Sequence, residues 1–173
     1  KNKQSFFIDI EDEESIKSAA NKASKDVKID MVIVATGMLH DANINPEKSL
    51  RDLSKEKFHQ LFSINTIAPA IIAKHFLPKL NKDSKSIFAA LSARVGSISD
   101  NQLGGWYSYR ASKSALNMVL KNASIGNEQE VRKEVQVQVE EEGPCLRRRR
   151  HRSTFGGDLI KGPGPGLGVG LTE

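Results

Sequence analysis

Short apolar runs alternate along the chain with longer stretches that carry apolar residues at helical spacing. Residues 30–35 and 86–91 are continuous apolar runs, a pattern typical of parallel strands covered by helices on both faces. Residues 5–10 form a shorter apolar run and are also predicted to be a strand. Residues 133–139 alternate with period two, which predicts a fourth strand. Residues 38–50 are rich in polar residues and are predicted to be a loop.

Three other stretches favour helices. Residues 15–25 are rich in Ala and Lys, and the four acidic residues before them suit the first turn of a helix. Ser54 is a good N-cap for a helix that runs onward to Leu80. A third helix contains Tyr109 and is expected to end at Gly126, since glycine is a common C-terminal stop.

This order of strands and helices predicts an open α/β fold. Strands that alternate with helices form parallel sheets through right-handed crossovers. In such sheets, ligands bind beyond the carboxyl ends of the strands. Asp9, the pair Thr36-Gly37, and Ser92 stand at those ends, so these residues are candidates for a binding site.

Tyr109 and Lys113 give this site its candidate chemistry. Their spacing of four puts both side chains on one face of a helix, one turn apart. A nearby ammonium favours the phenolate and lowers the pKa of a phenol from its ordinary value of about 10. The pair is therefore a plausible proton donor for a carbonyl oxygen near neutral pH.

The composition fits one globular domain followed by a tail. The chain has 173 residues, of which 38% are hydrophobic and 27% are charged, enough to bury a core. Cys145 is the only cysteine, which excludes an internal disulfide and a zinc site of several cysteines, and the four histidines have no metal-ligand spacing. No apolar run approaches the roughly 20 residues that cross a bilayer, and we expect a cytoplasmic protein. We predict a domain over residues 1–144 and a disordered tail over residues 145–173.

Much of the net charge of +5 comes from the basic run at residues 147–152. Such a run can bind nucleic acid, but no aromatic residue or folded motif accompanies it, so a solvated tail is favoured. The charge therefore says little about the folded part.

Four short motifs, in order along the chain, resemble those of the short-chain dehydrogenases/reductases. Y-R-A-S-K, which contains Tyr109 and Lys113, is similar to the family's Tyr-x-x-x-Lys, and S-I-N-T-I-A-P-A around Asn65 resembles its helix with a further catalytic residue. A-T-G at residues 35–37 resembles the end of its Asn-Asn-Ala-Gly motif, and Asp9-Ile10 resembles the pair beside the adenine. The resemblance covers residues 5–126 and is strongest to the C-factor and sniffer-like carbonyl reductases.

The resemblance implies reversible hydride transfer between NADP or NAD and a carbonyl or alcohol, on a partial Rossmann-type, doubly wound parallel sheet. Tyr109 would be the general acid, and Lys113 would lower its pKa and hold the nicotinamide ribose. Asn65 would position a water. The cofactor would also contact the residues matched to the family's cofactor motifs: Asp9, Ile10, Ala35 and Gly37. NADP is favoured by the subgroup alone.

Pro69 gives a physical reason for the role of Asn65. Proline has no N–H, so the carbonyl of Asn65, four residues earlier, loses its helical partner. We expect the helix to kink there and the freed carbonyl to accept a hydrogen bond from water.

The resemblance also implies a serine whose hydroxyl orients the substrate carbonyl, and three alternatives are open for it. Ser92 ends its strand but lies 17 positions before Tyr109, farther than is usual in the family. Ser97 is the second candidate. In the third alternative Ala93 holds the catalytic position, and the hydroxyl is missing.

The chain departs from the family at both ends. By the order of the family's motifs we expect the chain to begin in the third strand, without the first β-α-β unit and its Gly-rich phosphate-binding turn. The chain also diverges after about Gly126, where a reading-frame shift is one hypothesis. The alternative function is therefore a non-catalytic homologue that acts in interaction or signalling. In either case, homo-oligomers are expected through the helices that bear Asn65 and Tyr109.

Overall fold

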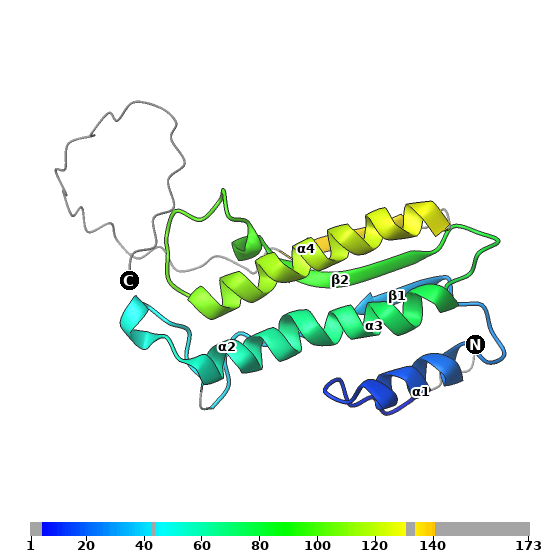
Figure 1. Ribbon diagram of the computed structural model, residues 1–173, viewed down its shortest axis with the longest axis horizontal. Coiled ribbons are helices and arrows are strands. Elements are labelled where there is room, and N and C mark those ends of the chain that lie inside the picture. Colours follow the sequence, from blue (N-terminus) through cyan, green and yellow to red (C-terminus); the bar gives the residue numbers. More distant parts are fainter. Residues whose placement is uncertain (1–4, 43, 131–133, 141–173) are drawn as a thin grey trace, which may run out of the picture. The chain divides into compact units, whose positions relative to one another are not determined.

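The computed structural model describes residues 5–42, 44–130 and 134–140 (Figure 1). The α-helices are α1 (Glu13–Ala23), α2 (Lys55–Phe62), α3 (Ala68–Phe76) and α4 (Tyr107–Glu130), and the strands are β1 (Met31–Val34), β2 (Ile87–Ala93) and β3 (Glu134–Glu140). Short 3₁₀ turns occupy Leu50–Asp52, Leu77–Lys79 and Arg94–Gly96.

The strands form one parallel sheet in the order β1-β2-β3. Val34 of β1 lies opposite Ala90, and Ser92 lies opposite Val139 of β3. Each connection between neighbouring strands passes through helices, because parallel strands need a long crossover. The predicted fold class, a partial Rossmann-type α/β sheet, is confirmed.

The core lies on the helical side of this sheet. Successive side chains of a strand point to opposite faces. Val34, Phe88 and Ala90 are buried against apolar residues of α1, α3 and α4, and Figure 1 shows α3 and α4 beside the strands. Met31 and Ile33, on the opposite face of β1, are 54% and 59% exposed. The prediction that both faces of this strand are covered is therefore wrong for the part of the chain that the structure describes.

Residues 5–10 are not a strand, which corrects the prediction. Phe7 is 87% exposed, and Phe6 and Ile8 are exposed as well. The segment instead turns into α1, where the backbone N–H of Asp9 donates to Ser15 Oγ at 2.9 Å. A strand needs a neighbour for its backbone hydrogen bonds, and no described strand lies beside this segment.

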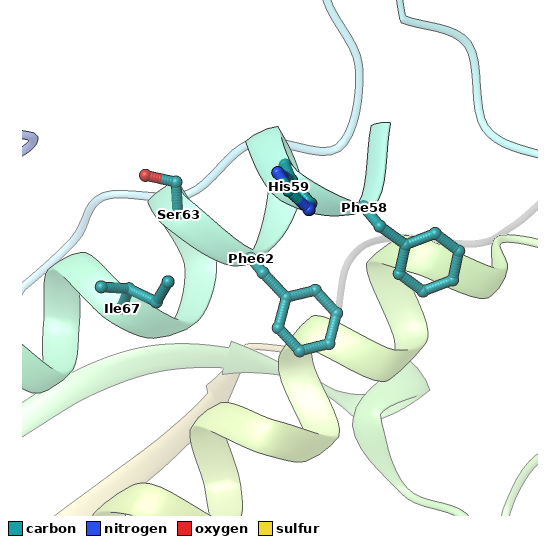
Figure 2. Close-up of a pocket in the computed structure, with 5 residues that line it drawn as sticks. All are labelled: Phe58, His59, Phe62, Ser63 and Ile67. Carbon is teal, nitrogen blue, oxygen red and sulfur yellow. The ribbon is translucent and has the colours of Figure 1, made fainter. Parts of the chain in front are cut away.

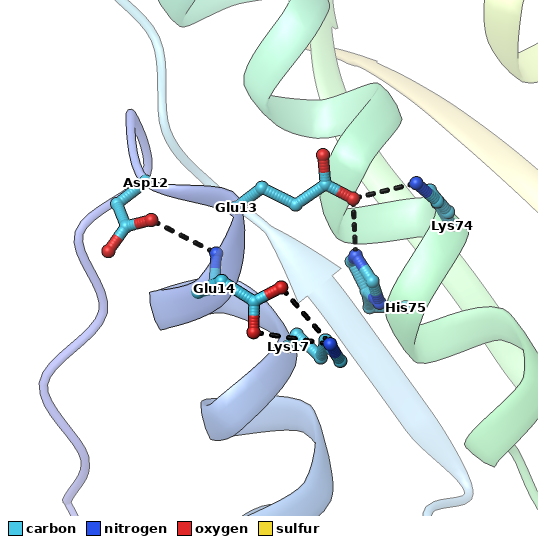
Figure 3. Close-up of polar contacts among 6 residues, drawn as sticks. All are labelled: Asp12, Glu13, Glu14, Lys17, Lys74 and His75. Atoms are coloured by element: carbon cyan, nitrogen blue, oxygen red, sulfur yellow. Dashed lines mark hydrogen bonds and ion pairs between the residues drawn. The ribbon is translucent and has the colours of Figure 1, made fainter.

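α1 is capped at its start and fastened to α3 by charged side chains (Figure 3). The Asp12 carboxylate accepts a hydrogen bond from the N–H of Glu14 at 3.0 Å. The carboxylate of Glu13 contacts Lys74 Nζ at 2.7 Å and His75 Nε2 at 2.9 Å. These two partners, Lys74 more than His75, lower the pKa of Glu13 from its ordinary value. The helix predicted over residues 15–25 is confirmed and begins two residues earlier.

The predicted helix from Ser54 to Leu80 is present but not continuous. Ser54 is the N-cap, and its hydroxyl accepts from Lys57 N at 3.1 Å. Between α2 and α3 the chain forms a π-turn over Ser63–Ile67, in which the N–H of Ala68 bonds to the carbonyl of Ser63, five residues back. Pro69 stands in the first turn of α3, where its missing N–H is tolerated. The irregularity expected from Pro69 thus takes the form of a widened turn.

α4 continues through Gly126 to Glu130, so the predicted stop at Gly126 is wrong. One glycine in a helix interior costs only about 1 kcal/mol relative to alanine, and Glu128, Gln129 and Glu130 beyond it are good helix formers. The strand predicted over residues 133–139 is confirmed as β3. The predicted tail at residues 145–173 lies outside the described residues, and its boundary stays a prediction. None of the described helices combines the length and apolarity that a membrane span requires.

Candidate active site

Lys113 and Tyr109 lie together on α4, at the carboxyl end of β2. Lys113 is 3% exposed, and its Nζ donates to the carbonyl of Leu91 at 3.0 Å. The same Nζ lies 5.8 Å from the centroid of the Tyr109 ring. Gly37 leaves room for this arrangement, because a Cβ there would stand 3.3 Å from Lys113 Nζ. A buried ammonium over a phenol favours the phenolate.

Asn65 joins three segments around this pair. Its side chain is fully buried and forms two hydrogen bonds of 2.8 Å with the backbone of Met38, one from the Met38 N–H and one to the Met38 carbonyl. Its Nδ2 also donates to Ser112 Oγ at 3.2 Å, and that hydroxyl donates to the Tyr109 carbonyl at 2.8 Å. Asn65 therefore fastens the loop after β1 to the π-turn and to the first turns of α4. We did not predict the part played by Ser112 from the sequence, although its position inside Y-R-A-S-K was a signal.

The candidates for the carbonyl-orienting serine differ in what their side chains contact. Ser92 donates from Oγ to Asn117 Oδ1 at 2.6 Å, one turn beyond Lys113 on α4. Ala93, the next residue along the strand, clusters with Tyr109 and Leu61. Ser97 lies in the following loop, where its Oγ accepts from the N–H of Asp100 at 3.3 Å. The structure thus places Ala93 in the apolar cluster of Tyr109, whereas the hydroxyls of Ser92 and Ser97 have hydrogen-bond partners in Asn117 and Asp100.

Apolar side chains form a wall beside Tyr109. Trp106 meets the Tyr109 ring edge-on, with 6.3 Å between centroids. Met38, Leu39 and Val95 are partly buried in the same cluster. Such a wall excludes water and strengthens electrostatic interactions at the phenol.

The turn before α4 is held by a buried acid that we did not predict. Glu47, in the loop after β1, is 1% exposed and accepts a short hydrogen bond from the hydroxyl of Ser108. Its backbone carbonyl accepts from the N–H of Trp106 at 2.6 Å. Nothing in the sequence signals this burial, because glutamate is rarely buried unless it is paired.

The predicted cofactor residues lie in two places. Ala35 and Gly37 follow β1 and are exposed at its carboxyl end, where Gly37 lies next to Lys113. Between them Thr36 has a buried hydroxyl without a partner among the described residues. Asp9 and Ile10 lie in the turn before α1, and Ile10 packs against the core cluster that includes Val34 of β1. The described residues contain no cluster of three His, Cys, Asp or Glu side chains that could hold a metal ion.

Residues 2–146 match the short chain dehydrogenase family. The chain belongs to this family. A similar relative is 1-hydroxy-2-glutathionyl-2-methyl-3-butene dehydrogenase of Rhodococcus sp. (strain AD45), 34% identical over 113 residues, which are 65% of this chain and 46% of that protein. C-signal of Myxococcus xanthus is 34% identical over 76 residues, 44% of this chain and 46% of the relative.

Among solved structures, the NADPH-bound carbonyl reductase from chicken fatty liver aligns with a TM-score of 0.60 at 27% identity. The alignment covers 75% of this chain and 54% of that one. This short-chain dehydrogenase therefore spans about half the length of the relatives it matches.

Proposed function

We propose that this short-chain dehydrogenase is an oxidoreductase that transfers hydride reversibly between a nicotinamide cofactor and a small carbonyl or alcohol. The observation that carries the proposal is the buried Lys113 ammonium over the Tyr109 ring at the carboxyl end of β2. A phenol in that position can give its proton to a carbonyl oxygen and take it back in the reverse direction.

The residues present fit the nicotinamide half of such a cofactor. Gly37 carries no side chain that would close the space beside Lys113 Nζ, and the buried Thr36 hydroxyl has no partner among the described residues. We propose that Ala35, Gly37 and Lys113 hold the nicotinamide ribose, and that Asp9 and Ile10 border the adenine. The cofactor supplies hydride to the carbonyl carbon when bound. An NADPH-bound relative supports NADP over NAD.

The chain's own residues would then supply the proton to the carbonyl oxygen. Lys113 favours the phenolate of Tyr109, which makes Tyr109 a better proton donor near neutral pH. Asn65 keeps the loop after β1 in register with α4, so that Tyr109 and the carbonyl oxygen meet. Ser92 stays a predicted carbonyl-orienting residue. The place of Ala93 in the apolar cluster of Tyr109 supports the alternative in which that hydroxyl is missing.

The test compares the only two tyrosines of the chain. Tyr109→Phe is expected to lower NADPH-dependent reduction of apolar aldehydes and ketones by 100-fold or more, since a positioned general acid contributes about 10² to 10⁴ in rate. Tyr107→Phe, two residues away, is the matched control and should keep the wild-type rate. Equal rates in both variants would reject Tyr109 as the acid. No change in NADPH fluorescence at millimolar cofactor would reject an enzyme in this chain.

An exposed apolar hollow supports a second candidate, a non-catalytic interaction protein that pairs with a second copy of itself. Figure 2 shows the hollow on α2 and the π-turn, lined by Phe58, His59, Phe62, Ser63 and Ile67. Ile67 is 55% exposed there, and a relative of this chain is named C-signal. If copies associate through this hollow, Ile67→Asp should convert a dimer into a monomer in sedimentation. Ile98→Asp, at an equally apolar residue that is 84% exposed, should not. A wild-type monomer at high concentration would reject this candidate.

A further inference from the structure

The side chain of Glu47 is buried against the first turn of α4. Its Oε1 accepts from the hydroxyl of Ser108, which is itself fully buried, and its Oε2 is buried without a partner among the described residues. Taking an ionised carboxyl group out of water costs on the order of several kcal/mol. Hydrogen bonds or a nearby positive charge must offset this cost. The N-terminal end of a helix provides part of that compensation through its dipole.

The backbone of Glu47 fixes an unusual turn. Gly104 and Gly105 have φ of 65° and 68°, and Trp106 follows at 52°, the one non-glycine residue with positive φ among those described. Left-handed backbone costs a residue with a Cβ about 1 to 2 kcal/mol. The Glu47 carbonyl accepts the Trp106 N–H at 2.6 Å, and a Cβ on Gly105 would stand 3.2 Å from that same oxygen. The backbone of residue 47 therefore packs closely against the turn that leads into α4, and the Glu47 carboxylate adds a side-chain contact to Ser108 in the first turn of that helix.

This turn leads directly to Tyr109. The Trp106 carbonyl accepts the N–H of Arg110 at 2.8 Å, the first helical bond of α4, and the Trp106 ring meets the Tyr109 ring edge-on. Lys113 is held by the carbonyl of Leu91 in the sheet. The loop after β1 and strand β2 therefore both contribute to the separation of phenol and ammonium.

We propose that Glu47 is a positioning residue for the Tyr109 phenol, acting through Ser108 and Trp106, a role that rests on the proposed function of Tyr109 as the proton donor. The Glu47 carboxylate accepts from Ser108, and its backbone carbonyl accepts from Trp106. Glu47 determines where the first turn of α4 begins, and so where the phenol stands relative to Lys113.

Position and charge make opposite predictions for the ionisation of Tyr109. The charged groups held around this turn are Glu47, Arg110, whose Nε donates to the Gly105 carbonyl at 3.1 Å, and Lys113. Removing the negative charge of Glu47 alone can only favour the phenolate, so Glu47→Gln should leave its titration midpoint unchanged or lower it. Glu47→Ala also removes the acceptor for Ser108. If Glu47 positions the phenol, the ring moves away from Lys113 in this variant, and the midpoint rises by about one pH unit.

The sequence offers a direct probe, because Trp106 is the only tryptophan. Tyrosinate accepts excitation energy from a neighbouring tryptophan, so Trp106 emission should fall as Tyr109 ionises. The measurement is Trp106 emission against pH in the full chain carrying Tyr107→Phe, so that Tyr109 is the only tyrosine. Variants of Glu47 are made in this background, and far-ultraviolet circular dichroism checks the fold at each pH.

A higher midpoint in Glu47→Ala, with none in Glu47→Gln, is the expected result. An unchanged or lower midpoint in Glu47→Ala would overturn the proposal, as would an equal rise in Glu47→Gln, which keeps the acceptor. If Glu47→Ala does not fold, Ser108→Ala carries the same test, since it removes only the hydroxyl that contacts the carboxylate.

A Lys113→Met variant separates failure of this proposal from failure of the proposed function. A parent midpoint that is not below that of Lys113→Met would reject the Tyr109–Lys113 acid pair. The positioning role of Glu47 is then read from near-ultraviolet circular dichroism of the Trp106–Tyr109 pair, which reports fixed aromatic packing. Glu47→Ala should lose that signal and Glu47→Gln should keep it, and an unchanged signal in Glu47→Ala would overturn the role.

Discussion

Replacing Asn65 tests whether its side chain holds the loop after β1 against α4. Asn65→Ala removes two hydrogen bonds of 2.8 Å to Met38 and one of 3.2 Å to Ser112. At about 1 kcal/mol net for each, the loss is about 3 kcal/mol. A domain is stable by only about 5–15 kcal/mol, so this is a large fraction of the total.

Urea unfolding followed by circular dichroism measures this loss. With a slope of about 2 kcal/mol per molar urea, the unfolding midpoint should fall by about 1.5 M. Asn122→Ala, an exposed asparagine on α4, is the matched control and should shift the midpoint by less than about 0.3 M, since surface substitutions stay within about 0.5 kcal/mol. If the urea midpoint of Asn65→Ala falls no further than that of this control, Asn65 does not hold the loop after β1 against α4.

Two further outcomes test the site and the fold. Ala93→Ser places a hydroxyl in the cluster that contains Tyr109. We expect the rate of carbonyl reduction to rise at least tenfold, because one positioned hydrogen-bond donor is worth about 10² in rate. An unchanged kcat would show that the hydroxyl does not reach the carbonyl. Glu13 has a pKa lowered by Lys74 and by His75, so its stabilising contribution is present above its ordinary pKa of 4.5 and is lost as pH falls through the lower folded value. The difference in Tm between wild type and Glu13→Gln should therefore shrink from pH 6 to pH 3, and a constant difference would exclude the ion pairs as its source.

The sequence alone determined the order of the elements and the chemistry of the site. Strand and helix periods are local properties, so β1, β2, β3 and the start of α2 follow from the pattern of apolar residues and one N-cap. The spacing of Tyr109 and Lys113 fixes their common face on any helix. Pro69 likewise forces an irregularity near Asn65, because a missing N–H acts wherever the helix lies.

Only the tertiary structure decided which side chains meet. Residues 5–10 have the composition of a strand, but strand formation requires a hydrogen-bonded neighbour, and no local pattern supplies one. Ser92 and Ala93 point to opposite faces of β2, and the packing of α4 determines that Ala93 joins the apolar cluster of Tyr109 while Ser92 bonds to Asn117. Glu47 and Ser108 are 61 residues apart in the chain, so their buried contact depends on the fold bringing the two segments together.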